Sequence, residues 1–162
     1  MLHRILHTRD DSLLTLLRLC LGFLFFAHGA QKALGWWGGP GYSTTLNAFA
    51  GMGIPAALAM LAILAEFAGG IGLLFGLLTR VAAFGITVVM AVAIFMVHAQ
   101  FGLFMNWAGS QKGEGFEYHI LATAISLTLM FRGAGAFSLD RLLEKALSGA
   151  HSPRLHPVPH HG

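Results

Sequence analysis

Four stretches of the sequence are apolar for long enough to be considered as membrane spans, and they constrain the fold more than any other feature. They cover residues 13–34, 55–78, 80–101 and 116–131, the last being the shortest. A helix crosses the hydrocarbon core of a bilayer with about 20 apolar residues. Lipid cannot satisfy open backbone groups, so spans of this kind must be helical. The sequence therefore predicts an all-α fold, an integral membrane four-helix bundle.

The composition agrees with a chain that lies in lipid. Charged residues make up 10% of the sequence and hydrophobic residues 56%, with a mean hydropathy of +0.68. Soluble domains carry about 25% charged residues, so water could not wet this surface. The formal charge of +3 is small, and we expect the basic residues to set orientation rather than to bind nucleic acid. The single cysteine, Cys20, cannot form an internal disulfide and is expected to be a buried, inert thiol.

The lysines and arginines predict that both termini are cytoplasmic. Only Lys32 and Lys112 then lie on the outer side, as the excess of positive charge in cytoplasmic segments requires. We divide the chain into a cytoplasmic N-terminal segment (1–12), the four-span domain (13–133), an interfacial helical segment (134–148) and a tail (149–162). Residues 139–147 alternate leucines with charged residues at helical spacing, which indicates an amphipathic helix. The tail is rich in His and Pro and is expected to be disordered.

Glycine, proline and hydroxyl residues mark the ends of helices. In the first outer loop, Ser43 or Thr44 is expected to cap a short helix. Residues 133–135 should stop the fourth span, and Ser138 should cap the helix that follows. Gly72 and Gly76 form a GxxxG pattern, which permits two helices to approach closely.

We single out the ionisable residues inside or just at the edges of the apolar runs, where an unpaired charge is costly and function is the default hypothesis. They are Arg18, His28, Lys32, Glu66, His98, Glu117 and His119. Arg18 lies in the inner half of the first run, and we expect it to be structural and to snorkel to the cytoplasm. The others fall at the middle or in the outer half of their runs.

The lean of helical side chains predicts that these outer residues meet. Side chains lean toward the N-terminus of their own helix. His28 and Lys32, four residues apart, therefore lean toward the midplane, and Glu66 leans outward to meet them. We expect Glu66 at the floor of a polar cluster, with His28 and Lys32 on one wall, His98 on another, and Glu117 and His119 at the rim. A purely structural pairing of Glu66 with Lys32 or His28, which would fix helix orientation, remains an alternative.

The chain resembles the DoxX family of small four-span membrane proteins over residues 17–143. The residues that carry the resemblance are Arg18-Leu19, His28-Gly29-Ala30-Gln31-Lys32, Glu66-Phe67-Ala68-Gly69-Gly70, Gly76-Leu77-Leu78-Thr79-Arg80, Ala82-Ala83, His98, Glu117-Tyr118 and residues 133–140. The resemblance implies a multi-pass protein of the bacterial inner membrane. It also implies a component of quinone-linked oxidoreductases, active in sulfur oxidation or in responses to thiol or quinone stress. With Cys20 alone, intrinsic thiol–disulfide chemistry is not expected.

The resemblance and the cluster together suggest that a quinone head group binds in the outer half of the bundle. Glu66, His28 and Lys32 are then the candidate catalytic residues, with His28 and Lys32 as donors and Glu66 as a proton relay. His98, Glu117 and His119 are candidates for contacting the cofactor, and no metal ligands are assigned.

Three other functions stay open. The chain could be a non-catalytic anchor for a soluble or membrane redox enzyme, a small carrier, or a haem or metal protein that uses His28, His98 and His119. The residues leave open whether the chain is itself an enzyme, and whether it forms a homo-oligomer.

Overall fold

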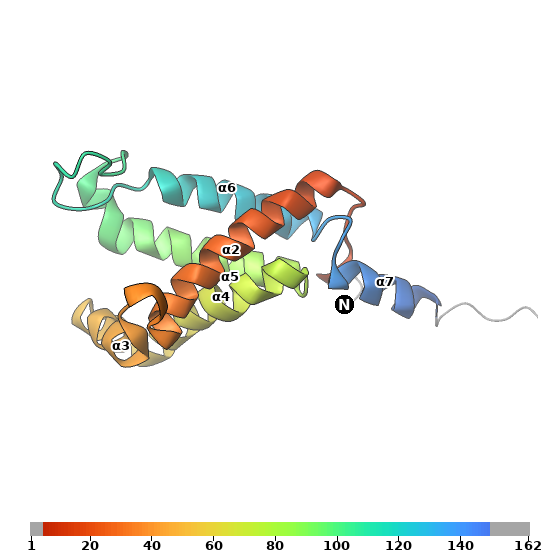
Figure 1. Ribbon diagram of the computed structural model, residues 1–162, viewed down its shortest axis with the longest axis horizontal. Coiled ribbons are helices and arrows are strands. Elements are labelled where there is room, and N and C mark those ends of the chain that lie inside the picture. Colours follow the sequence, from red (N-terminus) through yellow and green to blue (C-terminus); the bar gives the residue numbers. More distant parts are fainter. Residues whose placement is uncertain (1–4, 150–162) are drawn as a thin grey trace, which may run out of the picture.

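The computed structural model describes residues 5–149, and over that range the chain is all-helical (Figure 1). The helices in chain order are α2 (Ser12–Leu34), η1 (Trp36–Gly38), α3 (Gly41–Gly51), α4 (Ala56–Phe75), α5 (Thr79–Ala93), η2 (Ile94–His98), η3 (Ala99–Phe101), α6 (Glu117–Arg132) and α7 (Leu139–Gly149). The predicted all-α class is confirmed. Residues 150–162 of the predicted tail lie outside the described residues.

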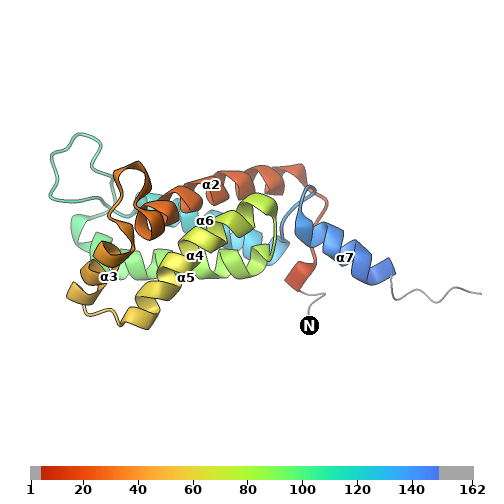
Figure 2. The same ribbon diagram turned by 60° about the horizontal axis from the view of Figure 1, so that its bottom comes forward.

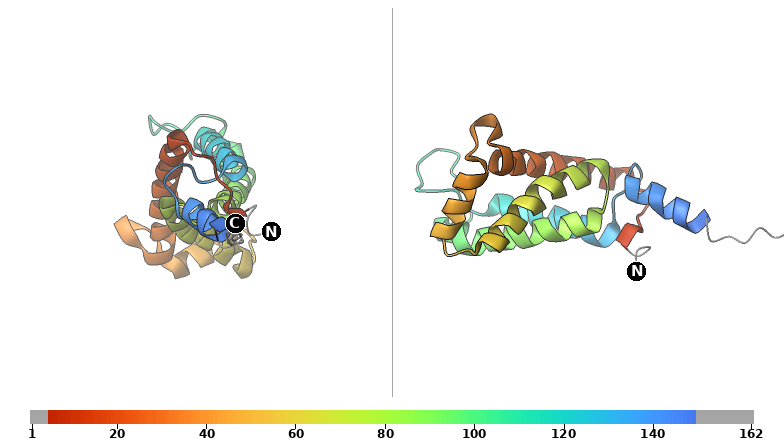
Figure 3. Two further views of the ribbon diagram at one scale, coloured as in Figure 1. Left: turned by 90° about the vertical axis from the view of Figure 1, so that its right-hand side faces the viewer. Right: turned by 90° about the horizontal axis from the view of Figure 1, so that it is seen from below.

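The bundle is elongated and consists of α2, α4, α5 and α6, which lie side by side along the length of the molecule (Figure 1). Helix α2 packs against α4, α4 against α5 and α5 against α6, and α6 closes the ring by contacting α2. Figure 2 shows α3 and the loop 102–116 at one end, which we call the loop end, and α7 at the other, the α7 end. The two further views in Figure 3 agree, with α7 projecting beyond the bundle.

Three of the predicted spans are long and apolar enough to cross a membrane. They are Ser12–Leu34, Ala56–Phe75 and Thr79–Phe101, the last made of α5, η2 and η3 together. Helix α6 has 16 residues, about 24 Å at helical rise, which is shorter than the hydrocarbon core. It is nonetheless the fourth helix of the bundle, because it packs along α5 and against α2.

Glycines allow α2 and α4 to pack closely. A Cβ atom at Gly29 would lie 2.4 Å from the backbone of Phe67, and one at Gly70 would lie 2.3 Å from the nitrogen of Phe26. Gly72 and Gly76, the predicted GxxxG pattern, do not form this contact. Gly76 lies just beyond the end of α4 with φ of 66°, a left-handed conformation that favours glycine at a helix C-terminus.

We expect Gly29→Ala to destabilise the bundle by about 1–3 kcal/mol, because the added methyl group overlaps main-chain atoms that cannot rotate away. Gly51→Ala is the matched control. Gly51 is also helical, and a Cβ there meets nothing within 4 Å, so this change should be neutral or slightly stabilising. Thermal unfolding in detergent measures both, and equal melting temperatures for the two variants would contradict the close α2–α4 packing.

A buried arginine ties the α7 end together. Arg18 on α2 is 2% exposed. Its guanidinium donates to the carbonyl oxygens of Ala134 at 2.9 Å, Leu74 at 2.8 Å and Phe137 at 2.6 Å, and also to that of Leu73. The prediction that Arg18 is structural agrees with these contacts, but the prediction that it snorkels to the cytoplasm is wrong. The carbonyl groups at the end of α4 and in the turn before α7 need donors, and Arg18 supplies them within the protein.

The start of α7 also caps a neighbouring helix. The Asp140 carboxylate, 1% exposed, accepts hydrogen bonds from the backbone nitrogens of Leu78 at 2.7 Å and Thr79 at 2.9 Å. A carboxylate at a helix N-terminus satisfies free N–H groups and complements the helix dipole. Ser138 Oγ accepts from the backbone nitrogen of Arg141 at 3.3 Å, so its predicted capping role is confirmed. Helix α7 is thus docked onto the α4–α5 turn.

The predicted cap of the loop-end helix differs from the structure. Helix α3 begins at Gly41, directly after Pro40, and no side chain caps it. Ser43 and Thr44 therefore lie inside its first turn. Proline is favourable at such a start because its φ is already helical and it lacks a backbone N–H.

Candidate functional site

A buried ion pair joins α2 to α4 in the half of the bundle nearer the loop end. Lys32 Nζ donates to Glu66 Oε2, and the two side chains are 28% and 4% exposed. Gly29, one turn before Lys32, lets the helices approach closely enough for this contact, since a Cβ there would lie 2.8 Å from the carbonyl carbon of Glu66. Glu66, in the middle of the second apolar run, thus pairs with Lys32 from the first apolar run, as predicted.

His28 lies beside this pair, at the surface between α2 and α6. Its ring is exposed, with its centroid 6.3 Å from that of Tyr118 on α6. Lys32 and Glu66 are both close enough to interact electrostatically with His28, and Glu66 interacts with Tyr118 as well. The Tyr118 hydroxyl is buried and has no hydrogen-bond partner among residues 5–149.

Two further histidines stack against each other from α6 and the end of the third span. The ring centroids of His98 and His119 are 4.0 Å apart, with 41° between the planes. His98 ends the π-helical turn η2, a departure from α-helix that is frequent at functional sites. His119 is 6% exposed, and its Nδ1 is buried without a partner in the described part of the chain. The His119 ring also lies edge-on to that of Tyr118, with centroids 5.5 Å apart. Ring contacts therefore link His98 through His119 and Tyr118 to His28.

The Glu117 side chain contacts the loop 102–116 rather than the polar cluster. Its Oε1 accepts hydrogen bonds from the backbone nitrogen of Met105 at 3.0 Å and from the indole nitrogen of Trp107 at 3.1 Å. It therefore holds the loop 102–116 against the start of α6, and its observed contacts do not place it on the rim where we expected it. Tyr118, the next residue, faces the cluster instead. No signal in the sequence pointed to Tyr118, because neighbouring residues of a helix point in different directions and the rotation of α6 decides which one faces the cluster.

The cluster borders a narrow crevice between α2 and α6. Cys20, Leu21 and Leu24 line one side, and Tyr118, Leu121, Ala122 and Ile125 line the other. Its volume is about 50 Å³, which is room for a water molecule, whose share of liquid volume is about 30 Å³. Cys20 is exposed on the outside of the bundle, so the expectation of a buried thiol is wrong.

The outer sides of this region are aromatic. The Phe26 ring contacts Trp36, Trp37 and Phe67 at centroid distances of 6.3, 6.4 and 5.8 Å. Within residues 5–149, no three His, Cys, Asp or Glu side chains are arranged to hold a metal ion. The arrangement brings together five hydrogen-bonding or proton-carrying side chains: Glu66, Lys32, His28, Tyr118 and His119. Of these, Tyr118 also lines the crevice between α2 and α6.

Comparison with known proteins places the chain in a family. The sequence model of the DoxX family matches residues 13–99. The inner membrane protein YqjF of Escherichia coli is 35% identical over 84% of this chain and 95% of its own length. A Bacillus subtilis protein named "Putative oxidoreductase CatD" is 31% identical, over 80% of this chain and 86% of its own.

A third relative, an uncharacterized membrane protein of Mycobacterium tuberculosis, is 34% identical over 88% of both chains. No solved structure matches the chain at a significant level. The matches, together with the apolar helices, show a multi-pass protein of the inner membrane. The family match covers more than half of the sequence, including His28, Lys32, Glu66 and His98. The chain belongs to the DoxX family.

Proposed function

We propose that this protein is the membrane component of a quinone-linked redox system, and that its polar cluster binds the quinone head group and handles a proton. The observation that carries the proposal is a buried Lys32–Glu66 pair beside two buried polar atoms, Tyr118 OH and His119 Nδ1, that have no partner among the described residues. A buried polar group without a partner costs about 1–3 kcal/mol. A ligand with hydrogen-bonding groups would relieve this cost. The name of CatD supports a redox role for the family.

The donors in the cluster fit a quinone head group. Each of its two carbonyl oxygens accepts hydrogen bonds, and the Tyr118 hydroxyl, the imidazoles of His28 and His119 and the Lys32 ammonium can donate them. The crevice beside Tyr118 holds about 50 Å³, less than a ring requires. Binding therefore requires side chains at the α2–α6 contact, such as Leu24 and Leu121, to move apart. These residues lie where a ligand dissolved in the bilayer would enter.

Within this proposal each side chain has a separate role. A bound quinone supplies two-electron, two-proton chemistry, and the electrons come from a partner redox enzyme. Glu66 holds a proton or releases it, and Lys32 balances the negative charge of the carboxylate in the low-dielectric interior. Tyr118 and His28 orient the head group at the crevice. His119 and His98 continue the row of proton-carrying side chains toward the loop end. There, His98 Nδ1 lies 2.8 Å from the carbonyl oxygen of Glu114.

The test is a titration of the purified protein with decylubiquinone, a short-chain quinone. Ligand at 100 times its Kd adds about 2.7 kcal/mol to the stability of the protein and raises the melting temperature. We expect Tyr118→Phe and His28→Ala to lose most of this rise. Tyr118→Phe is the sharper variant, because it removes only a hydroxyl without a partner and should not lower the stability of the free protein.

Tyr42→Phe is the matched control, since Tyr42 is 43% exposed on α3, away from the crevice. A rise that is unchanged in both Tyr118→Phe and His28→Ala would discard the proposed site. That result, together with retained activity of a co-purifying enzyme, would favour the alternative of a non-catalytic anchor.

A further inference from the structure

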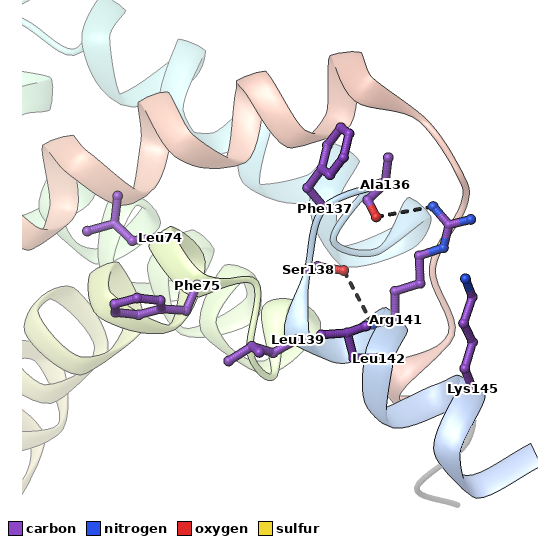
Figure 4. Close-up of a pocket in the computed structure, with 9 residues that line it drawn as sticks. All are labelled: Leu74, Phe75, Ala136, Phe137, Ser138, Leu139, Arg141, Leu142 and Lys145. Atoms are coloured by element: carbon purple, nitrogen blue, oxygen red, sulfur yellow. Dashed lines mark hydrogen bonds between the residues drawn. The ribbon is translucent and has the colours of Figure 1, made fainter.

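A second, larger pocket lies at the α7 end, far from the polar cluster. It lies between the end of α4, the turn before α7 and the first two turns of α7, and its volume is about 530 Å³. Figure 4 shows its lining: Leu74, Phe75, Ala136, Phe137, Ser138, Leu139, Arg141, Leu142 and Lys145. This volume is in the range of small-molecule sites, about 300–1,000 Å³. The proposed redox function makes no use of this pocket.

The charged side chains that line the pocket, Arg141 and Lys145, are both basic. Arg141 forms an ion pair with Asp10 and donates to the carbonyl oxygen of Ala136 at 3.1 Å. The hydrogen bond from Arg141 holds the pKa of Asp10 below its ordinary value, so this pair is neutral overall at neutral pH. Glu144 is engaged on another side, by His7 at 2.7 Å and the backbone nitrogen of Thr8. Lys145 is near enough to Asp10 to interact with it electrostatically, but it forms no direct ion pair with a described residue.

The opposite wall is apolar and open. Phe75 is 63% exposed and Leu142 62% exposed, and both line the pocket. Figure 4 shows Leu74, Phe75 and Leu139 on one side of the pocket and the ends of Arg141 and Lys145 on the other. The first turn of the amphipathic helix α7 docks onto the α4–α5 turn, so the pocket lies where two apolar spans end. An apolar wall next to cationic side chains at this depth matches a phospholipid with a negative head group.

We propose that this pocket is a binding site for one anionic phospholipid. The acyl chain lies against Leu74, Phe75 and Leu139, and the phosphate lies between the Arg141 guanidinium and the Lys145 ammonium. The phosphate then supplies a direct ion-pair partner, which Lys145 lacks within the described part of the chain. The bound lipid also fastens α7 to α4, next to the contacts of Arg18 and Asp140.

Native mass spectrometry of the full-length protein in detergent tests the site. The two probes are dioleoyl phosphatidylglycerol and dioleoyl phosphatidylcholine, which have the same acyl chains and differ in charge. We expect the wild-type protein to retain phosphatidylglycerol, the anionic lipid, in preference to phosphatidylcholine. Lys145→Gln should reduce this retention about fivefold, since one basic residue near the surface contributes about 1 kcal/mol to binding of anionic lipid. Lys112→Gln at the loop end is the matched control and should leave retention unchanged.

Two more measurements separate the parts of the proposal. Leu142→Ser, at an exposed position of the apolar wall, should also reduce retention, and glycerol 3-phosphate without acyl chains should not displace the lipid. The inference is overturned if both lipids are retained equally, if Lys145→Gln and Lys112→Gln behave alike, or if the free head group competes as well as the whole lipid. None of these readouts involves quinone, so the two proposals fail independently.

Discussion

Arg18→Ala is expected to lower the free energy of unfolding by at least about 3 kcal/mol, which makes it one of the two most damaging single changes we predict. The side chain is 2% exposed and donates to four backbone carbonyl groups from the end of α4 and the turn before α7. Removing it leaves those oxygens buried without donors and opens a cavity. Unfolding in detergent, followed by circular dichroism, measures the loss.

Two companion variants define what Arg18 contributes. Arg18→Lys should also be strongly destabilised, because a single ammonium group cannot donate to carbonyl oxygens on several sides as the planar guanidinium does. Arg9→Ala is the matched control, since the Arg9 side chain is exposed and surface changes usually stay within about 0.5 kcal/mol. If Arg18→Ala behaved like Arg9→Ala, Arg18 would not hold the α7 end together.

The second large effect is expected at the Lys32–Glu66 pair. Lys32→Met should destabilise the protein by about 3–5 kcal/mol, because it leaves a carboxylate that is 4% exposed without its counter-charge. Glu66→Gln should cost less, since Lys32 is 28% exposed and its ammonium can move toward the surface. The double variant should recover much of the loss, because no uncompensated charge is then buried. Thermal unfolding of all four proteins gives the coupling energy.

The double variant also separates a structural pair from a functional one. If the pair only orients α2 against α4, the restored protein should show the same decylubiquinone-induced rise in melting temperature as the wild type. If Glu66 and Lys32 take part in binding, the rise should stay absent although stability has returned. The second result is the one that our proposed function requires.

Much of the fold could be predicted because the constraints act along the chain. The length of an apolar run sets whether a helix can cross a bilayer, and Gly133 and Ser138 ended and restarted helices where expected. The meeting of Glu66 with Lys32 could also be predicted. Helical side chains lean toward the N-terminus, and consecutive spans run in opposite directions, so residues at the middle of one and in the outer half of the other converge.

Other features of the site depended on rotation of the helices about their axes. Glu117 and Tyr118 are adjacent on α6, so one faces the loop and the other the cluster, and no feature of the sequence says which. His98 ends a π-helical turn, and its ring lies against that of His119. The burial of Arg18 arose in the same way, because its four acceptors come from segments more than 50 residues away along the chain.

The sequence by itself determined that this protein is a helical membrane bundle of the DoxX type with acidic and basic groups at one level inside it. Hydrophobicity and helical periodicity are local properties, so they can be read directly from the order of residues in one sequence. Only the tertiary structure decided which polar groups face one another, which remain without partners, and that Arg18 is enclosed rather than solvated. Those outcomes follow from how closely α2 approaches α4 at its glycines and how α6 closes the ring, and such packing depends on all the helices at once.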